Sequence, residues 1–413
     1  MRPRSRPAAM MTASAGVVAF IVLLALGGAA PAAAGDLKNA VRDLFGGDGI
    51  TLQPTPPPFP SHAPHFTAAS LSGLDALGAP ITASINTFAF NSTVTAFTFD
   101  IERGVPVRTT DSLGPLLAER ALTLGAGKLN IGFSYTRVEF TRFQGRDLDN
   151  LSLIFAHEDS NNDGRLGGGV FDFERDQIRV DLDLDIEQDI FALFGTYGIT
   201  RHWDVGVIVP IVHLTFRADA RATIIRNSAV STGVHNFGPG GDSPTSRTGG
   251  EETGIGDVIL RSKYNFLRSR PVWPDLAVVG QIKLPTGDED RLLGTGETDF
   301  LGMLVASKTL GPVNPHVNVG YEVSTAGHEE NRLRYVAGFD ARLHQRLSAA
   351  VEVIGRWKPE GDGTADHIVD LALGGRWNVF GAFLLNAAVQ LPLNRNEGLR
   401  PDVIWTVGVD YTF

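Results

Sequence analysis

The last twelve residues of the chain constrain its fold more than any other segment. From Val403 to Phe413 every second residue is apolar or aromatic, and the residues between them are mainly polar or small. Successive side chains of a β-strand point to opposite faces, so a period of two residues indicates a strand. The chain therefore ends in a strand with one apolar face, and its final residue is aromatic.

The same alternation recurs upstream and predicts twelve strands in all. They are expected at 128–143, 177–199, 203–226, 256–268, 275–286, 297–309, 315–325, 332–343, 346–358, 367–377, 381–392 and 402–413. A strand that crosses a bilayer needs about 9–11 residues, apolar toward lipid and polar toward the lumen. The first three strands are longer, and their alternation slips near 135–138 and 187–191, which predicts bulges or extensions beyond the membrane.

The lengths of the connections favour a closed barrel. Five are short, and the alternating ones at 144–176, 227–255, 287–296, 326–331, 359–366 and 393–401 are generally longer. Short turns on one rim, long loops on the other and an even strand number are typical of bacterial outer-membrane barrels. A periplasmic β-sandwich would also alternate, but it would not explain the loop asymmetry or the aromatic terminus. We predict an all-β, antiparallel transmembrane β-barrel of about twelve strands in the outer membrane of a Gram-negative cell. It would contact lipid and be recognised by the barrel-assembly machinery through the strand that ends at Phe413.

The N-terminal third has a different character. Residues 1–34 combine arginines, an apolar core at 16–25 and Ala32–Ala34, which predicts a signal peptide, with a membrane anchor as the alternative. Residues 35–65 form an N-terminal segment that ends in a linker with six prolines at 54–65. Residues 66–127 include expected strands at 81–90 and 93–101 and a strand or helix at 116–124. We expect 66–127 to be a periplasmic segment or a plug in the lumen, and 128–413 to be the barrel.

Several functions are disfavoured by composition and by missing motifs. The formal charge of −10 gives no general electrostatic footprint for nucleic acid, and the absence of cysteine excludes disulfides and thiolate metal sites. A membrane-embedded hydrolase would need a serine paired with a histidine, and His213 has no accompanying GxSxG motif. We therefore expect no enzyme and keep the hydrolase as the weakest alternative.

One stretch of the sequence resembles a known family. Residues 254–321 contain GIGDVILRSKYNF, QIKLPTGDED and GTGETDFLGMLVASKTLGPVNPHVNVGY. They resemble outer-membrane transporters named for the meta-pathway of phenol degradation, and the resemblance extends over about 128–413. It implies that a small molecule, aromatic or hydrophobic, crosses the outer membrane. It implies no catalytic residues.

The polar faces of the expected strands carry charges of both signs. They could form a conduit that orients a solute. They could instead form an ion-pair network that closes the lumen, which would leave a structural or surface-interaction barrel. The candidate lumen residues are Arg261, Lys263, Lys283, Asp299, Glu322, Arg334, Asp340, Arg342, Glu352, Arg356, Asp370, Arg376, Asp402 and Asp410.

A single segment suggests a cofactor. Asp159, Asn161 and Asp163 match the beginning of a calcium-binding loop, although Val170 stands where a glutamate is required. A solvated turn would have the same composition. Calcium is therefore the only cofactor that the sequence suggests.

Overall fold

The computed structural model describes residues 37–45, 49–53, 97–100, 105–108 and 112–413, except 158, 160–162, 229–233, 239–240, 269 and 362–366. The expected signal peptide, the proline-rich linker and the expected strand at 81–90 lie outside these residues. Of the expected strand at 93–101, Phe97–Asp100 forms β1, which pairs with β2 (Val105–Arg108).

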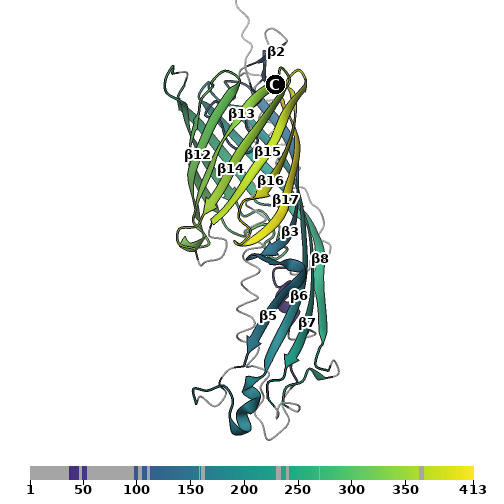
Figure 1. Ribbon diagram of the computed structural model, residues 1–413. Coiled ribbons are helices and arrows are strands. Elements are labelled where there is room, and N and C mark those ends of the chain that lie inside the picture. The colour runs from purple at the N-terminus through teal and green to yellow at the C-terminus, as the bar shows by residue number, and fades with distance from the viewer. Residues whose placement is uncertain are drawn as a thin grey trace, which may run out of the picture. The chain divides into compact units, whose positions relative to one another are not determined.

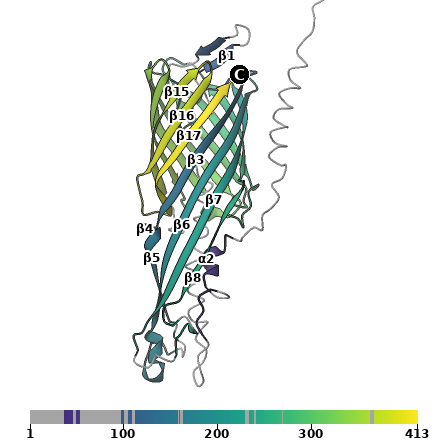
Figure 2. The same ribbon diagram turned by 90° about the vertical axis from the view of Figure 1, so that its right-hand side faces the viewer.

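Twelve strands close an antiparallel barrel, which confirms the expected fold (Figures 1 and 2). They are β3 (Leu129–Phe143), β6 (Gln177–Gly198), β7 (Trp203–Ile225), β9 (Val258–Leu267), β10 (Asp275–Leu284), β11 (Asp299–Ser307), β12 (Val313–Ser324), β13 (Arg332–His344), β14 (Leu347–Trp357), β15 (His367–Phe380), β16 (Phe383–Pro392) and β17 (Leu399–Thr412). Each corresponds to one of the twelve predicted strands and differs from it by a few residues at its ends.

The final strand closes the barrel against the first. β17 pairs with β3 from Leu399↔Phe143 to Thr412↔Asn130, and β3 pairs with β6 on its other side. The ladder ends with two backbone bonds between Phe413 and Leu129. Closure leaves no free sheet edge within the membrane, where unpaired backbone groups would be costly.

The barrel exposes apolar side chains and buries polar ones. On β12, Val317, Val319 and Tyr321 expose 45–48% of their surface, whereas Asn318 and Glu322 expose 1% and 7%. Water-soluble proteins show the reverse distribution, because charged side chains are rarely buried in them. The outer surface is therefore suited to lipid, and the polar face lines the interior.

The outward face of β6 marks where the wall leaves the lipid. Phe191 and Leu193 are exposed apolar residues, and beyond them the same face carries Asp185, Glu187 and Asp189. The register with β7 continues through this change without a shift. The expected extension beyond the membrane is present, and the ladders of β6 with β3 and β7 have no bulge at either expected position. The ladder of β3 with β17 does shift register next to the first position, between Phe140 and Val138.

β6 and β7 continue beyond the barrel as part of a lobe, which we call the extension (Figures 1 and 2). β5 (Leu151–Ala156) pairs with the far end of β6, and β8 (Thr245–Ile255) pairs with that of β7. β4 (Arg146–Asp147) and the 3-10 turns η1 (Leu148–Asn150) and η2 (Gly169–Arg175) complete it, while η5 (His328–Glu330) lies in another loop. These segments were expected to be loops. β8, TSRTGGEETGI, has almost no apolar alternation, and β5, LSLIFA, is only six residues long.

The N-terminal segment packs on the inner face of the extension. Leu37, Val41 and Leu44, on or beside α2 (Ala40–Asp43), join Leu214 and Phe216 of β7 in one buried apolar cluster. Burial of this kind stabilises by about 25 cal/mol per Å² of apolar surface. The segment before the proline-rich linker is therefore an integral part of the extension. Within the described residues, no helix has the length and apolar character needed to cross a membrane.

Candidate functional site

Residues 112–124, which we call the plug segment, lie inside the barrel. Their backbone N–H groups donate to inward-facing side chains of the wall rather than to a neighbouring strand. The bonds run from Leu113 to Ser348 Oγ (2.9 Å), from Leu116, Leu117 and Ala118 to Glu352 (2.7–3.1 Å), from Glu119 to Asn318 Oδ1 (2.7 Å), from Ala121 to Ser307 Oγ (3.1 Å) and from Leu124 to Asp204 Oδ2 (2.8 Å). Side chains of four barrel strands, β7, β11, β12 and β14, thus satisfy the buried backbone donors of the plug segment.

The expected strand or helix at 116–124 is not present. The plug segment has no regular secondary structure along these residues. The reason is that its amides find acceptors on β7, β11, β12 and β14, so no local hydrogen-bond pattern is required. An apolar run alone cannot distinguish this arrangement from a strand or a buried helix.

The wall is made of small residues where the plug segment passes. Leu116 and Leu117 pack against Ala350, Ala372 and Ala388. A Cβ atom added at Gly374 would lie 2.9 Å from Leu116 Cδ1. Larger wall residues would fill the space that the two leucines occupy, so the wall and the plug segment are sterically matched.

Three buried ion pairs, formed by two neighbouring residues, fix the plug segment to separate parts of the wall. Glu119 lies 2.7 Å from Arg261 Nη2 and 3.2 Å from Lys263 Nζ, both on β9. Arg120 Nη2 lies 2.6 Å from Asp340 Oδ2 on β13. All five side chains expose 8% or less of their surface. Breaking a buried pair by removing one partner is strongly destabilising, because the other charge stays desolvated.

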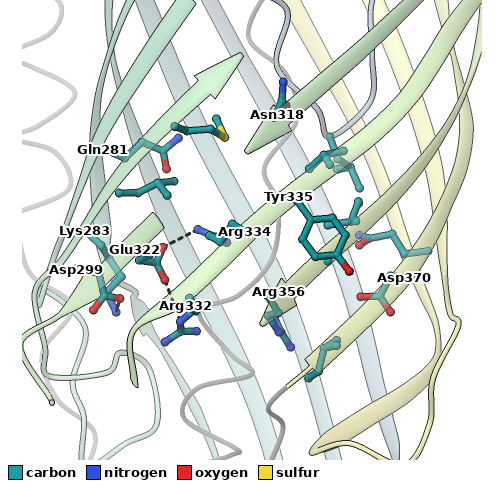
Figure 3. Close-up of a pocket in the computed structure, with 18 of the residues that line it drawn as sticks. Gln281, Lys283, Asp299, Asn318, Glu322, Arg332, Arg334, Tyr335, Arg356 and Asp370 are labelled. Atoms are coloured by element: carbon teal, nitrogen blue, oxygen red, sulfur yellow. Dashed lines mark hydrogen bonds and ion pairs between the residues drawn. The ribbon is translucent and has the colours of Figure 1, made fainter. Parts of the chain in front are cut away.

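A cavity of about 150 Å³ lies in the lumen, and Leu117 and Glu119 of the plug segment are among the residues that line it. Figure 3 shows part of its lining on the barrel wall. We call it the lumen cavity. Its wall residues, such as Lys283 and Asp299, lie near the strand ends that join the long loops. Long loops are extracellular in bacterial barrels, so the cavity occupies the extracellular half of the lumen.

The lining of the lumen cavity combines charged and apolar side chains. The basic members are Arg261, Lys283, Arg332, Arg334, Arg356 and Arg400, and the acidic members are Glu119, Asp299, Glu322 and Asp370. Glu322 lies between Arg332 (3.1 Å) and Arg334 (2.8 Å), as Figure 3 shows. Lys283 pairs with Asp299 at 2.6 Å, and Arg400 pairs with Asp370. The arrangement can hold a polar group among fixed charges beside an apolar surface.

Comparison with known proteins identifies the family. Residues 160–399 match the family described as "Putative MetA-pathway of phenol degradation", which is more than half of the chain. The chain belongs to this family. The match confirms the resemblance found in the sequence, and no curated protein matches the chain.

Several solved outer-membrane proteins are similar in structure. The COG4313 outer membrane channel from Pseudomonas putida F1 is 12% identical with a TM-score of 0.43, and the match covers 71% of this chain and 98% of the channel. A FadL homologue from Pseudomonas aeruginosa is 10% identical with a TM-score of 0.32 and coverages of 69% and 89%. The P. putida toluene transporter TodX is 8% identical with a TM-score of 0.30 and the same coverages.

The three segments that carry the family resemblance meet at the rim of the lumen cavity. Asp257, from the first segment, accepts hydrogen bonds from Gly287 N (3.1 Å) of LPTGD and from Thr295 N and Oγ1 (both 2.9 Å) of GTGETD. A Cβ at Gly287 would lie 2.7 Å from Gly294 Cα, so both glycines permit the close approach. Lys283 reaches the same group through Thr295 Oγ1. The family segments therefore form one hydrogen-bonded rim.

Replacement of Asp257 by alanine should destabilise this rim. The change leaves two partly buried backbone donors without their acceptor and removes one buried carboxylate near Lys283, so we expect a loss of about 2–4 kcal/mol in the free energy of unfolding. Urea titration in lipid vesicles, followed by tryptophan fluorescence, measures it. Asp290→Ala, at an exposed position of the same loop, is the matched control. Equal midpoints for the two variants would contradict the assigned role of Asp257.

The expected lumen residues fall into three groups. Arg261, Lys283, Asp299, Glu322, Arg334, Arg356 and Asp370 line the lumen cavity, Lys263, Asp340 and Glu352 contact the plug segment, and Arg342, Arg376 and Asp410 are buried or half-buried elsewhere on the wall. Asp402 departs from the expectation. Its side chain is 52% exposed and pairs with Arg395, because the β17–β3 register shifts between Pro401 and Ile404. The role of the expected lumen residues in binding or passing a solute stays a prediction.

Sequence reasoning missed several residues of the site. Glu119 and Arg120 hold the plug segment, and Arg332 and Arg400 line the cavity. A signal was available for the first pair, because two adjacent opposite charges interrupt the apolar run LLAERAL. Buried charges are usually paired, so such an interruption indicates a partner elsewhere in the fold.

The expected calcium loop is only partly described. Asp159 accepts bonds from the backbone N–H groups of Asp163 (3.3 Å) and Gly164 (2.7 Å), and Asp163 accepts one from Arg165 (2.9 Å). Asn161 lies outside the described residues. Among the residues that are described, no group of three or more His, Asp or Glu side chains could hold a metal ion. Calcium binding stays a prediction.

Proposed function

We propose that this barrel carries a small aromatic or hydrophobic molecule across the outer membrane and that the plug segment gates the passage. The observation that supports the proposal is an amphipathic cavity in the lumen whose inner boundary is a segment without regular structure. The family's description refers to phenol degradation, which agrees with an aromatic solute. The plug segment is not a member of the barrel wall, so it can move without opening the strand ladder.

A reversible cross-link tests whether the plug segment must move. The chain has no cysteine, so Ala121→Cys with Ser307→Cys introduces a single pair, at positions joined by a 3.1 Å bond from backbone N to Oγ. We expect the oxidised form to block both ion conductance in planar bilayers and uptake of radiolabelled phenol by cells that produce the barrel. Reduction should restore both. The two single-cysteine variants are the controls.

The outcomes separate transport from a closed barrel. Equal uptake in the oxidised and reduced forms would refute gating by the plug segment. No conductance and no uptake in the reduced form or in the unmodified chain would instead favour a structural barrel. An assay of cross-link formation on gels, with and without reductant, establishes that the lock has formed.

A second candidate function is surface interaction through the extension. It is favoured by the folded lobe that β5 to β8 form, since the two long connections project as a structured unit and not as loops. Its outward face is charged, with Arg217 bridging Asp185 and Glu251 at 3.3 Å. A variant that lacks the extension tests this function. Loss of binding to whole cells or cell-surface material in that variant, with conductance retained, would support surface interaction over transport.

Two further expectations belong to the proposal. We expect the assembly machinery to recognise β17 with Phe413, so deletion of Phe413 should reduce the amount of folded barrel in the membrane. We assign no reaction to the chain. Nitrogen Nδ1 of the His213 ring contacts the hydroxyl of Thr253 (2.7 Å).

A further inference from the structure

We propose that the lumen cavity is a binding site for a one-ring aromatic carboxylate. The inference rests on the proposed function and makes it more specific, because it names the chemical class of the solute. It follows from three properties of the cavity: its volume, its excess of guanidinium groups and the position of its apolar wall.

The volume limits the ligand to about one ring. The cavity measures about 150 Å³. An apolar protein cavity of about this volume holds one benzene molecule. A benzene ring with a carboxylate at the open side would fit within it.

The charges of the lining favour an anion. Six basic and four acidic side chains face the cavity. Arg334 and Arg356 lie directly opposite each other on β13 and β14, and Arg332 is two residues before Arg334 on the same face. Like charges at opposed positions of a sheet destabilise it. Glu322 contacts Arg332 and Arg334, and Glu330 lies 3.6 Å from Arg332. The basic side chains of the lining still outnumber the acidic ones, six to four, and an anionic ligand would reduce this excess of positive charge.

The guanidinium groups also favour a carboxylate over other small anions. The planar fork of arginine matches the two oxygens of a carboxylate and binds them through paired N–H···O bonds. Arg334 and Arg356 project from adjacent strands, so one carboxylate can contact both groups.

Apolar side chains line the cavity beside these arginines, with Val336 on β13 and Ile354 on β14, and also across the barrel from them. Ile208 on β7 and Phe140 on β3 line the cavity. In the closed strand order, β7 is six strands from β14 in either direction. A ligand that points its carboxylate toward Arg334 and Arg356 can therefore place its ring against apolar side chains of the lining. Guanidinium groups beside apolar side chains match an aromatic carboxylate better than a neutral hydrocarbon or a cation.

Four probes of similar size test the inference on the full mature chain in detergent. Isothermal titration compares benzoate with benzyl alcohol, which lacks the charge, with benzylammonium, which reverses it, and with acetate, which lacks the ring. We expect benzoate to bind at least about tenfold more tightly than each of the others.

Variants of the two arginines identify the site. Arg334→Gln and Arg356→Gln should each weaken benzoate binding about tenfold and leave benzyl alcohol unchanged, because only the anion uses the guanidinium group. The benzoate affinity of Arg334→Lys should lie between those of the unmodified chain and Arg334→Gln, since lysine keeps the positive charge but lacks the planar guanidinium fork. Arg342→Gln is the matched control, because Arg342 is a half-buried arginine on the same strand but does not line the cavity. Retention of the heat-modifiable barrel on gels verifies folding of each variant.

The results distinguish this inference from the proposed function. Equal affinity for benzoate and benzyl alcohol, or no effect of either glutamine variant, would overturn the carboxylate site even if the cross-link still gates phenol uptake. If benzoate binds and the glutamine variants weaken its binding as expected, but phenol uptake is the same with and without the cross-link, the carboxylate site is supported and gating by the plug segment is refuted.

Discussion

Glu352→Gln should release the plug segment and raise the open probability of the barrel about 30- to 150-fold. The Glu352 carboxylate is fully buried and accepts three consecutive backbone N–H groups, from Leu116, Leu117 and Ala118. A carboxamide offers one oxygen and turns an N–H₂ group toward donors. At least one bond to a charged acceptor is lost, which corresponds to about 2–3 kcal/mol of docking free energy.

Single-channel recording in planar bilayers measures this effect. Glu360→Gln is the matched control, because Glu360 is an exposed glutamate just beyond the end of the same strand. The wall should remain intact, since the ladder of β14 with β13 and β15 does not involve the side chain. An open probability equal to that of the control would mean that these three bonds do not hold the barrel closed.

Asp340→Ala should weaken docking of the plug segment by about 3–5 kcal/mol. Asp340 is fully buried, pairs with Arg120 at 2.6 Å, accepts a bond from Asn314 Nδ2 at 3.0 Å and also contacts the Ser112 hydroxyl. The alanine leaves Arg120 without this buried carboxylate. Removing both charges should be less damaging than removing one, so the double variant Arg120→Ala with Asp340→Ala should recover part of the loss.

Hydrogen exchange of the plug segment measures this second effect. The amides of Leu113, Leu116 and Ala121 are bonded to wall side chains and should lose protection in Asp340→Ala. Asp410→Ala is the matched control, because Asp410 is a buried luminal aspartate that bonds to Asn130 of the wall. If Asp340→Ala and Asp410→Ala change these amides equally, the ion pair is not a specific anchor of the plug segment.

The two anchors act on different parts of the same segment. Glu352 holds the backbone of residues 116–118, and Asp340 holds the side chain of Arg120. Because they lie on adjacent strands, β13 and β14, the energies of the two variants need not add. Comparison of the double variant Glu352→Gln with Asp340→Ala with its two single variants would show whether the plug segment leaves its site in one step.

The sequence by itself determined the barrel. A period of two residues assigned the twelve strands, because a strand that faces lipid on one side and a polar lumen on the other must alternate. The alternation of short and long connections assigned their antiparallel order. The charged residues on the inward faces, such as Lys283 and Glu322, followed from the same parity.

Only the tertiary structure decided what fills the barrel. The plug segment bonds through Glu352, Asn318 and Asp204, which are more than 70 positions away in the chain, so no local pattern reveals its conformation. β8 is a strand because the long ladder of β7 offers it a partner, although its own sequence has little strand character. Pairing between distant segments, and the register shift that exposes Asp402, depend on closure of the whole wall. Periodicity records which face a residue occupies, whereas contacts between distant segments exist only after the chain has folded.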